Sequence, residues 1–269
     1  MTNVLKMLTL NLHYDQAGFG PWPRRRAQIQ TLLENEKPHI VALQAVHASE
    51  TLDQAEDLAR AGHYAHKLFL ATTESIPHQG SAILANIPLS APWSYALPRC
   101  DQDEDPSFRR AIAATFAWCG EVWQFTNAHF SWIGTQNLAQ AQTLAMALEA
   151  FPGPQCLVGD LHAPSGSAAA LHLKNLAWID SLEKAVRNHD NGPNAPTHTP
   201  ESRIDSILVK EVDEARIREV RVLTEPGAPL SDHRAVLLTL QPPTHEAKKK
   251  THIPVGPQVR STDTLKLGV

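Results

Sequence analysis

Several polar residues of the chain stand where short apolar runs end or begin, and their types are those that carry out acid–base chemistry. Asp160 follows the run Cys156–Gly159, and Asp205 precedes the run Ile207–Val209. His233 precedes the final apolar run. Carboxylates and imidazoles at such positions can accept and donate protons in a hydrolytic reaction. Because α/β proteins place their sites where strands end, these residues are expected to meet in one cleft.

Each of these residues also has an ordinary structural explanation when it is taken alone. Asp160 can cap a turn, and Asn127 can be a buried amide with satisfied hydrogen bonds. The segment Ser231–His233 can be a polar loop. Short motifs are weak signals singly, so their order along the chain carries more weight than any one of them.

The order of the motifs resembles that of the endonuclease/exonuclease/phosphatase superfamily, which includes deoxyribonuclease I, exonuclease III, inositol polyphosphate 5-phosphatases and neutral sphingomyelinases. In chain order the motifs are Leu-Asn-Leu around Asn11, Pro-His-Ile-Val-Ala-Leu-Gln over 38–44, Gln-Gly-Ser-Ala-Ile-Leu over 79–84, Asn-Ala-His-Phe over 127–130, Val-Gly-Asp-Leu over 158–161, Arg-Ile-Asp-Ser-Ile over 203–207 and Ser-Asp-His-Arg over 231–234. The resemblance runs from about residue 5 to residue 240. It is specific for the fold and leaves the substrate open.

This resemblance implies a metal-dependent phosphoester hydrolase, a phosphodiesterase of nuclease-like type. Asp160 would orient or deprotonate the attacking water, and His233, held by Asp205, would contact the phosphate and transfer protons. His129 belongs with these catalytic residues. The remaining expected site residues are the phosphate contacts Arg109, Asn127 and His162 and the metal ligands Asn11 and Asp232. Carboxylates and amides around a phosphate are the ligands that Mg²⁺ prefers.

Two positions depart from the family pattern. Gln44–Val46 reads Gln-Ala-Val where Gln-Glu-Val is expected, so a methyl group at Ala45 replaces the principal metal-binding carboxylate. Gly159–His162 ends in histidine where the pattern has asparagine. Three interpretations stay open: an altered metal shell, a catalytically inactive module that binds a phosphorylated ligand, and an engineered inactivation. In the first, His162 and His47 would supply nitrogen ligands and favour Mn²⁺ or Zn²⁺, but for His47 a surface position is the favoured interpretation.

The elements that must position these residues are short strands interrupted by a few helices. Strands are expected at Leu5–Leu12, His39–Leu43, Lys67–Ala71, Ser81–Ala85, Ala111–Trp118, Val122–Ala128, Gln155–Val158, Arg203–Val209, Arg216–Leu223 and Ala235–Leu240. Helices are expected between Pro21 and Pro38, at Thr51–Ala61 and at Gln136–Ala150. Strands alternating with helices and hairpins indicate two packed sheets with helices outside. The resemblance makes this a four-layer α/β sandwich of two mixed sheets.

Composition and charge indicate the class of protein and the compartment in which it works. A net charge of −4 argues against a protein that coats nucleic acid. Three scattered cysteines indicate no disulfide framework and favour a reducing compartment, so we predict a cytoplasmic protein. No apolar run is long enough to span a bilayer, and the first residues look like a strand rather than a signal peptide.

From residue 241 onward the sequence is basic and has almost no apolar period, unlike the rest of the chain. We predict one endonuclease/exonuclease/phosphatase domain over 1–240 and a basic, disordered tail over 241–269. The expected partner is a phosphoester substrate, and no protein partner is evident. Nucleic acid is only slightly favoured, since the body has no evident basic stripe or row of exposed aromatic residues.

Overall fold

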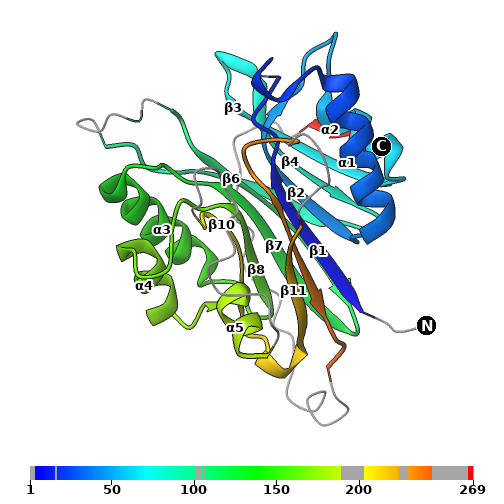
Figure 1. Cartoon of the computed structure of the whole chain (residues 1–269). Coiled ribbons are helices and arrows are strands. Elements are labelled where there is room, and N and C mark those ends of the chain that lie inside the picture. The colour runs from blue at the N-terminus through cyan, green and yellow to red at the C-terminus, as the bar shows by residue number, and fades with distance from the viewer. Residues whose placement is uncertain are drawn as a thin grey trace.

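The computed structural model of the chain describes residues 4–15, 17–100, 105, 107–188, 203–223, 230–243 and 266–268. Two β-sheets pack face to face, and helices cover the outer face of each sheet (Figure 1). The predicted four-layer α/β sandwich is therefore confirmed. The two sheets are mixed, because each contains one parallel pair of strands among antiparallel ones.

The first sheet is built around a parallel pair of strands that are buried on both faces. Its strand order is β11 (Ile217–Leu223), β12 (Ala235–Leu240), β1 (Leu5–Asn11), β2 (Ile40–His47), β4 (Ile76–Ala85), β3 (His66–Thr73) and β13 (Lys266–Gly268). Strands β1 and β2 are parallel, with Asn11 opposite Gln44. Helices α1 (Trp22–Glu36) and α2 (Gln54–Ala61) cover its outer face.

The second sheet repeats this plan. Its strand order is β5 (Ser90–Ala96), β6 (Arg110–Trp118), β7 (Glu121–His129), β8 (Gln155–Asp160), β10 (Asp205–Lys210) and β9 (Ile179–Asp180). Strands β7 and β8 are parallel. Helices α3 (Gly134–Leu148) and α4 (Ala168–Asn175) cover the outer face, and α5 (Ser181–Asn188) lies against β10 and β11. Short 3-10 helices occupy Ala17–Phe19 and Glu214–Arg216.

Three hydrophobic layers hold these four structural layers together. The central one lies between the sheets and includes Met7, Trp123 and Val158. A second lies under α1 and α2, and a third lies under α3 and α4. Strands β1, β2 and β8 carry nearly continuous buried residues because each contributes to two of these layers. The site residues Asn11 and Asp160 stand at the ends of β1 and β8.

The expected elements are present with boundaries that shift by a few residues. Sequence analysis missed β5, α4, α5 and the short strands β9 and β13, which have few apolar residues or are too short to show a period. The predicted disordered tail lies outside the described residues except at 241–243 and 266–268. Residues 266–268 pair antiparallel with β3 at the sheet edge, which the tail prediction did not include. None of the helices in the described ranges is long and apolar enough to cross a membrane.

Candidate active site

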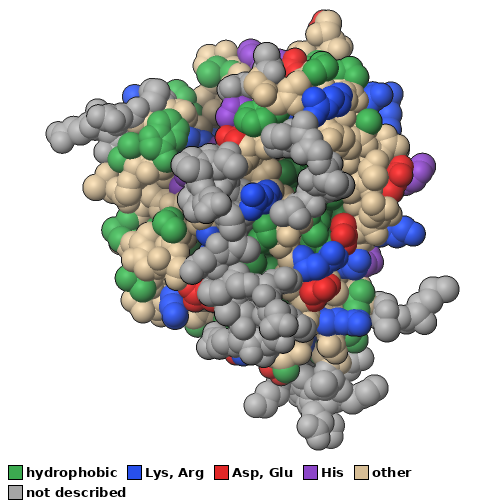
Figure 2. Space-filling view, in the orientation of Figure 1, with side chains coloured by type: hydrophobic (Ala, Val, Ile, Leu, Met, Phe, Trp, Pro, Cys, Tyr) green, Lys and Arg blue, Asp and Glu red, His purple; other side chains and the backbone are tan. Residues whose placement is uncertain are grey.

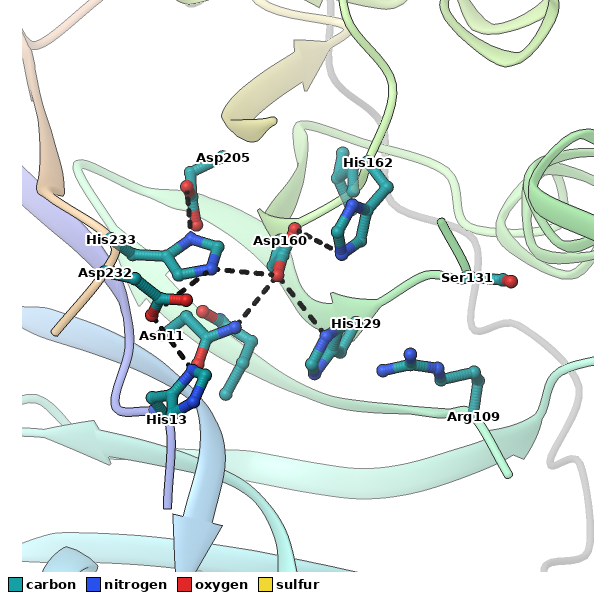
Figure 3. A network of polar contacts seen from close by, with 12 residues as sticks. Asn11, His13, Arg109, His129, Ser131, Asp160, His162, Asp205, Asp232 and His233 are labelled. Carbon is teal, nitrogen blue, oxygen red and sulfur yellow. Dashed lines mark hydrogen bonds and ion pairs between the residues drawn. The ribbon is translucent and has the colours of Figure 1, made fainter. Parts of the chain in front are cut away.

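A cluster of contacting polar side chains, called the pocket below, lies at one end of the sandwich, where strands of both sheets finish. The register places Asp160 at the end of β8 opposite His129 of β7 on one side and Asp205 of β10 on the other. Asn11 at the end of β1 and the loop before β12, which carries His233, complete the pocket (Figure 3). The parallel pairs β1–β2 and β7–β8 bring their carboxyl ends to the same edge, as strand-end placement predicts.

Asp160 is the centre of this arrangement, and its side chain is fully buried. Asn11 donates a hydrogen bond from Nδ2 to Asp160 Oδ2 at 2.9 Å. Nε2 of His129 lies 3.3 Å from Oδ2, and Nε2 of His162 lies 3.3 Å from Oδ1. Nε2 of His233 lies 3.7 Å from Oδ2. One carboxylate therefore faces an amide and three imidazoles, as Figure 3 shows.

The electrostatic surroundings keep this carboxylate ionised. Burial alone would raise the pKa of Asp160, since a charged group loses its hydration inside a protein. The charges of His162 and His233 outweigh burial, and the pKa of Asp160 falls below its ordinary value. Asp160 is consequently an acceptor for protons or for a positive ligand at neutral pH.

A second buried pair fixes His233. Its Nδ1 lies 2.7 Å from Oδ2 of Asp205. Burial disfavours the imidazolium, but the hydrogen bond and negative charge of Asp205 prevail and raise the pKa of His233 to about 9. The His233 backbone N–H also donates to Ser231 Oγ at 3.2 Å. With Nδ1 bound to Asp205, the protonated ring presents Nε2 to the pocket as a donor.

Arg109 and His129 lie on the other side of Asp160. The Arg109 guanidinium contacts Asp105 at 3.2 Å and lies 5.4 Å from the centre of the Trp132 ring. Burial, and next the positive charge of Arg109, lower the pKa of His129 well below its ordinary value. His129 is therefore neutral. Arg109, His129 and Tyr14 line a cleft of about 180 Å³ beside the pocket.

Asn127 has a structural role that corrects its expected contact with phosphate. It is fully buried, and Nδ2 donates to the carbonyl oxygens of Leu43 and Ala82, both at 2.9 Å. Its Oδ1 accepts from Gln44 Nε2 at 2.7 Å. Because both amide hydrogens are used, no donor remains for an anion. Asn127 ties β7 of one sheet to β2 and β4 of the other beneath the pocket.

The expected metal corner contains a histidine that sequence analysis missed. Nδ1 of His13 lies 3.0 Å from Asp232 Oδ1, and its backbone N–H donates to Asn11 Oδ1 at 2.9 Å. The signal was its place two residues beyond Asn11, at the end of the same apolar run. His13 thus engages the oxygen atoms of both predicted metal ligands.

Strand β2 is irregular where the family pattern has glutamate. Ala45 is buried with φ of 48°, and the pairing of β2 with β4 shifts between Leu43 and Val46. Side-chain alternation is broken there, so His47 does not continue the face of Ala45. His47 Nε2 contacts Ser49 Oγ at 3.2 Å, and its ring lies against that of His78. These contacts argue against the less favoured interpretation, in which His47 supplies a metal ligand.

These residues do not fit a Mg²⁺ shell at the Ala45 corner. Mg²⁺ requires several hard oxygen ligands in near-octahedral geometry. The corner offers one carboxylate, Asp232, and one amide oxygen, Asn11, and both already contact His13. Elsewhere in the described residues, two groups bring three possible ligand atoms within 4.8 Å of one another, namely His129 with Asp160 and His162, and Asp160 with Asp205 and His233.

Two packed mixed sheets with a carboxylate–imidazole pocket at one end place the protein among the four-layer α/β sandwiches. Residues 8–233 match the sequence profile of the Endonuclease/Exonuclease/phosphatase family. The chain belongs to this family, whose members include nucleases and phosphatases. No curated protein is significantly similar to the chain.

Solved structures with this fold are similar along almost their whole length. An endonuclease/exonuclease/phosphatase family protein from Bacteroides thetaiotaomicron has a TM-score of 0.74 and 19% identity, covering 89% of this chain and 98% of that one. A mannosyl-6-phosphatase from the same organism has a TM-score of 0.71 and 20% identity, covering 87% and 98%. The human Nocturnin catalytic domain with bound sulfate has a TM-score of 0.68 and 17% identity, covering 89% and 94%. At these identities the likeness concerns the fold.

Proposed function

We propose that the chain is a phosphoester hydrolase, a nuclease-like phosphodiesterase whose metal site is altered. The observation that carries the proposal is the position of Asp160 between Asn11 and the buried His233–Asp205 pair. An ionised acceptor and a protonated donor thus share one pocket. Attack of water on a phosphoester needs both, since water must lose a proton while negative charge on the phosphate is stabilised.

Each side chain has a role that follows from its contacts. Asp160 would hold the attacking water and accept its proton. His233, kept protonated by Asp205, would donate from Nε2 to a phosphate oxygen. Arg109 would bind the phosphate from the opposite side with the planar fork of its guanidinium donors. Asn11 would fix the orientation of the Asp160 carboxylate through its 2.9 Å hydrogen bond.

The substrate class that these surroundings favour is nucleic acid or a nucleotide. Phe108 and Trp132 are each 52% exposed, and both flank Arg109. Sequence analysis found no row of exposed aromatic residues because these two are far apart in the chain. Aromatic rings beside a phosphate-binding arginine can stack with bases. On the face seen in Figure 2, basic and acidic side chains are interspersed among the described atoms.

A binding module that does not cut its ligand is the second candidate. The observation that favours it is Ala45, because the chain lacks a carboxylate where the family pattern places one. Such a module would use Arg109 and protonated His233 to hold a phosphate. Asp160 would then accept no proton, because no water would attack the phosphate.

The two candidates are separated by measuring binding and hydrolysis on the same substrates. We would incubate the protein with a single-stranded oligonucleotide, bis(p-nitrophenyl) phosphate and p-nitrophenyl phosphate, with Mg²⁺, Mn²⁺ or Zn²⁺ supplied in turn. The hydrolase predicts turnover that falls by about 100-fold or more in Asp160→Asn. Asp213→Asn, a carboxylate that caps a remote 3-10 helix, is the matched control.

Oligonucleotide binding that is tight in the parent, with no turnover under any metal, would favour the binding module. Turnover that survives Asp160→Asn would remove this pocket from the reaction. For the substrate class, the double variant Phe108→Ala/Trp132→Ala is expected to raise KM for the oligonucleotide and leave that for p-nitrophenyl phosphate unchanged. Tyr95→Ala, an exposed aromatic residue on β5, is its control.

A further inference from the structure

We propose that His129, Asp160 and His162 form a binding site for a borderline divalent ion such as Zn²⁺. Two imidazole nitrogens and one carboxylate oxygen from these residues lie within 4.8 Å of one another. His129 ends β7, Asp160 ends β8, and His162 follows β8 directly. In Figure 3, dashed lines join the Asp160 carboxylate to both rings. This ligand set is displaced from the Ala45 corner, where the Mg²⁺ ligands are incomplete.

The separations suit ligands that share one ion. Two ligand atoms that each lie about 2.1 Å from an ion are about 3.4 Å apart at a tetrahedral angle. Nε2 of His129 lies 3.3 Å from Asp160 Oδ2, and Nε2 of His162 lies 3.3 Å from Asp160 Oδ1, so the two imidazoles approach different oxygens of one carboxylate. These distances exceed those of good N–H···O hydrogen bonds. The two rings are stacked, with centres 6.0 Å apart and an angle of 17° between their planes.

Asp160 supplies an independent observation. It is fully buried, and its Oδ1 accepts no hydrogen bond of standard geometry from any described residue. A buried carboxylate oxygen without such a bond is unfavourable unless a positive group satisfies it. The only described group at ion-pair distance from Oδ1 is His162. A metal ion between Asp160 and the two imidazoles would satisfy this oxygen.

The backbone holds the ligands in place before any ion arrives. The Phe130 N–H donates to the Asp160 carbonyl oxygen, and the Leu161 N–H donates to the Ile204 carbonyl oxygen, both at 2.9 Å. His162 adopts a φ of 44°, a conformation that residues other than glycine rarely adopt. Such conformations persist where the surrounding structure fixes them, frequently at functional sites.

The chemistry of the ligands selects the ion. Imidazole nitrogen suits Zn²⁺ and other transition ions, whereas Mg²⁺ prefers oxygen and keeps several waters. The family asparagine at position 162 would offer an amide oxygen, and histidine replaces it with nitrogen. The loss of a carboxylate at Ala45 lowers the affinity for Mg²⁺. The gain of a nitrogen ligand at His162 favours Zn²⁺, so both changes shift the preference from Mg²⁺ to Zn²⁺.

The proposed metal site shares residues with the proposed hydrolase site but does not depend on hydrolysis. Asp160 has two oxygens, and Oδ2 also faces Asn11 and His233. Metal binding can be measured without substrate, so the metal site and the hydrolytic function can fail separately.

The test is titration of the full-length protein, with its purification tag removed, with Co²⁺ followed by visible absorption. Nitrogen ligation in a four- or five-coordinate site gives absorption bands that octahedral water does not. Calorimetry with Zn²⁺ and Mg²⁺ supplies the affinities. We expect one Co²⁺ site per chain, displaced by Zn²⁺, with Mg²⁺ at least about tenfold weaker. His162→Asn and His129→Asn should each weaken Zn²⁺ binding at least about tenfold, since even outer-shell changes cost that much.

His47→Asn is the matched control, because its ring contacts Ser49 and His78 instead of Asp160. Its Co²⁺ spectrum and Zn²⁺ affinity should equal those of the parent. An unchanged Co²⁺ spectrum in His162→Asn, loss of the spectrum in His47→Asn, or equal affinities for Mg²⁺ and Zn²⁺ in the parent would each overturn the proposal. If His162→Asn unfolds, His162→Gln gives the same test on a folded chain, with thermal melting to establish folding.

Discussion

Nδ1 of His233 lies 2.7 Å from Oδ2 of Asp205, and both side chains are buried at the junction between the two sheets. Asp205 opens β10 and His233 precedes β12, so each sheet contributes one partner. A carboxylate this deep inside a protein requires a positive partner. Protonation of His233 therefore affects both the charge of the pocket and the contact between the two sheets.

The first prediction concerns Asp205→Asn. An amide keeps the shape of the carboxylate but removes its charge, so the pKa of His233 should fall from about 9 toward or below its ordinary value. Histidine NMR titration of the parent and the variant measures this directly. If the pKa of His233 does not fall, Asp205 has no part in the reaction.

The same pair makes folding stability depend on pH. Because the pKa of His233 is raised on folding, from about 6.5 to about 9, its stabilisation is fully present below pH 6.5 and is lost as pH rises through 9. The contribution is up to about 3 kcal/mol. Urea unfolding between pH 6 and pH 10 should show this decline in the parent. In Asp205→Asn the decline over the same range should be much smaller.

The second prediction concerns the missing carboxylate. We expect Ala45→Glu to raise Mg²⁺ affinity and hydrolysis together, because it adds a hard oxygen ligand beside Asn11 and Asp232. Ala45 already adopts a positive φ of 48°, so glutamate adds a side chain to a backbone that is already in this conformation. Calorimetry measures the affinity. Ala45→Gln has the same shape without the charge and should bind Mg²⁺ more weakly than Ala45→Glu. Unchanged Mg²⁺ affinity in Ala45→Glu would mean that position 45 does not face the site.

The sequence predicts the fold well because the buried strands carry long apolar runs, with the site residues Asn11 and Asp160 where two of these runs end. This pattern is sufficient to place Asn11, Asp160 and His233 in one cleft. The expected role of Asn127 was wrong for a related reason. A strand-end amide looks the same in sequence whether it faces the pocket or, as here, donates to the carbonyl oxygens of the opposite sheet.

Other features of the site depend on geometry that residue spacing does not encode. The irregularity of β2 at Ala45 breaks the alternation that would have placed His47 in the pocket. His13 joins Asp232 across 219 positions through a turn with positive φ, which no periodicity reveals. The aromatic residues that flank Arg109 likewise come from separate segments.

The third prediction tests the buried ion pair that holds Arg109. Asp105 is fully buried and Arg109 nearly so, with 3.2 Å between them. Arg109→Ala leaves an uncompensated charge and should destabilise the fold by about 3 kcal/mol or more. The double variant with Asp105→Asn should regain a substantial part of this loss in urea unfolding. Arg60→Ala, which removes an exposed contact with Glu56, is the control and should cost about 1 kcal/mol or less. Equal losses in the two single variants would mean that the Asp105 charge is satisfied without Arg109.

The last prediction concerns Gly159, the residue that sets Asp160 against β7. Its φ is 140°, and a Cβ atom there would lie 2.0 Å from the Ala128 carbonyl oxygen, which belongs to the rigid backbone of β7. Gly159→Ala must therefore separate β7 from β8 next to the pocket, and should cost about 3 kcal/mol or more in urea unfolding. Gly120→Ala provides the control. Gly120 has a φ of 83° but nothing within 4 Å of the added Cβ, so this variant bears only the backbone strain of about 1–2 kcal/mol.

Gly159→Ala should also move the Asp160 carboxylate away from His129, because these residues pair in register at the ends of β8 and β7. Folded Gly159→Ala protein should therefore lose more activity or metal binding than the Gly120→Ala variant does. The physical reason is that the chemistry of Asp160 depends on contacts of 2.9–3.7 Å with groups from three other segments. A displacement of about 1 Å at Gly159 is enough to break such contacts while leaving the hydrophobic layers intact. If Gly159→Ala matched Gly120→Ala in both stability and activity, the strands would tolerate the added methyl group, and the close approach of β8 to β7 would not be what positions Asp160.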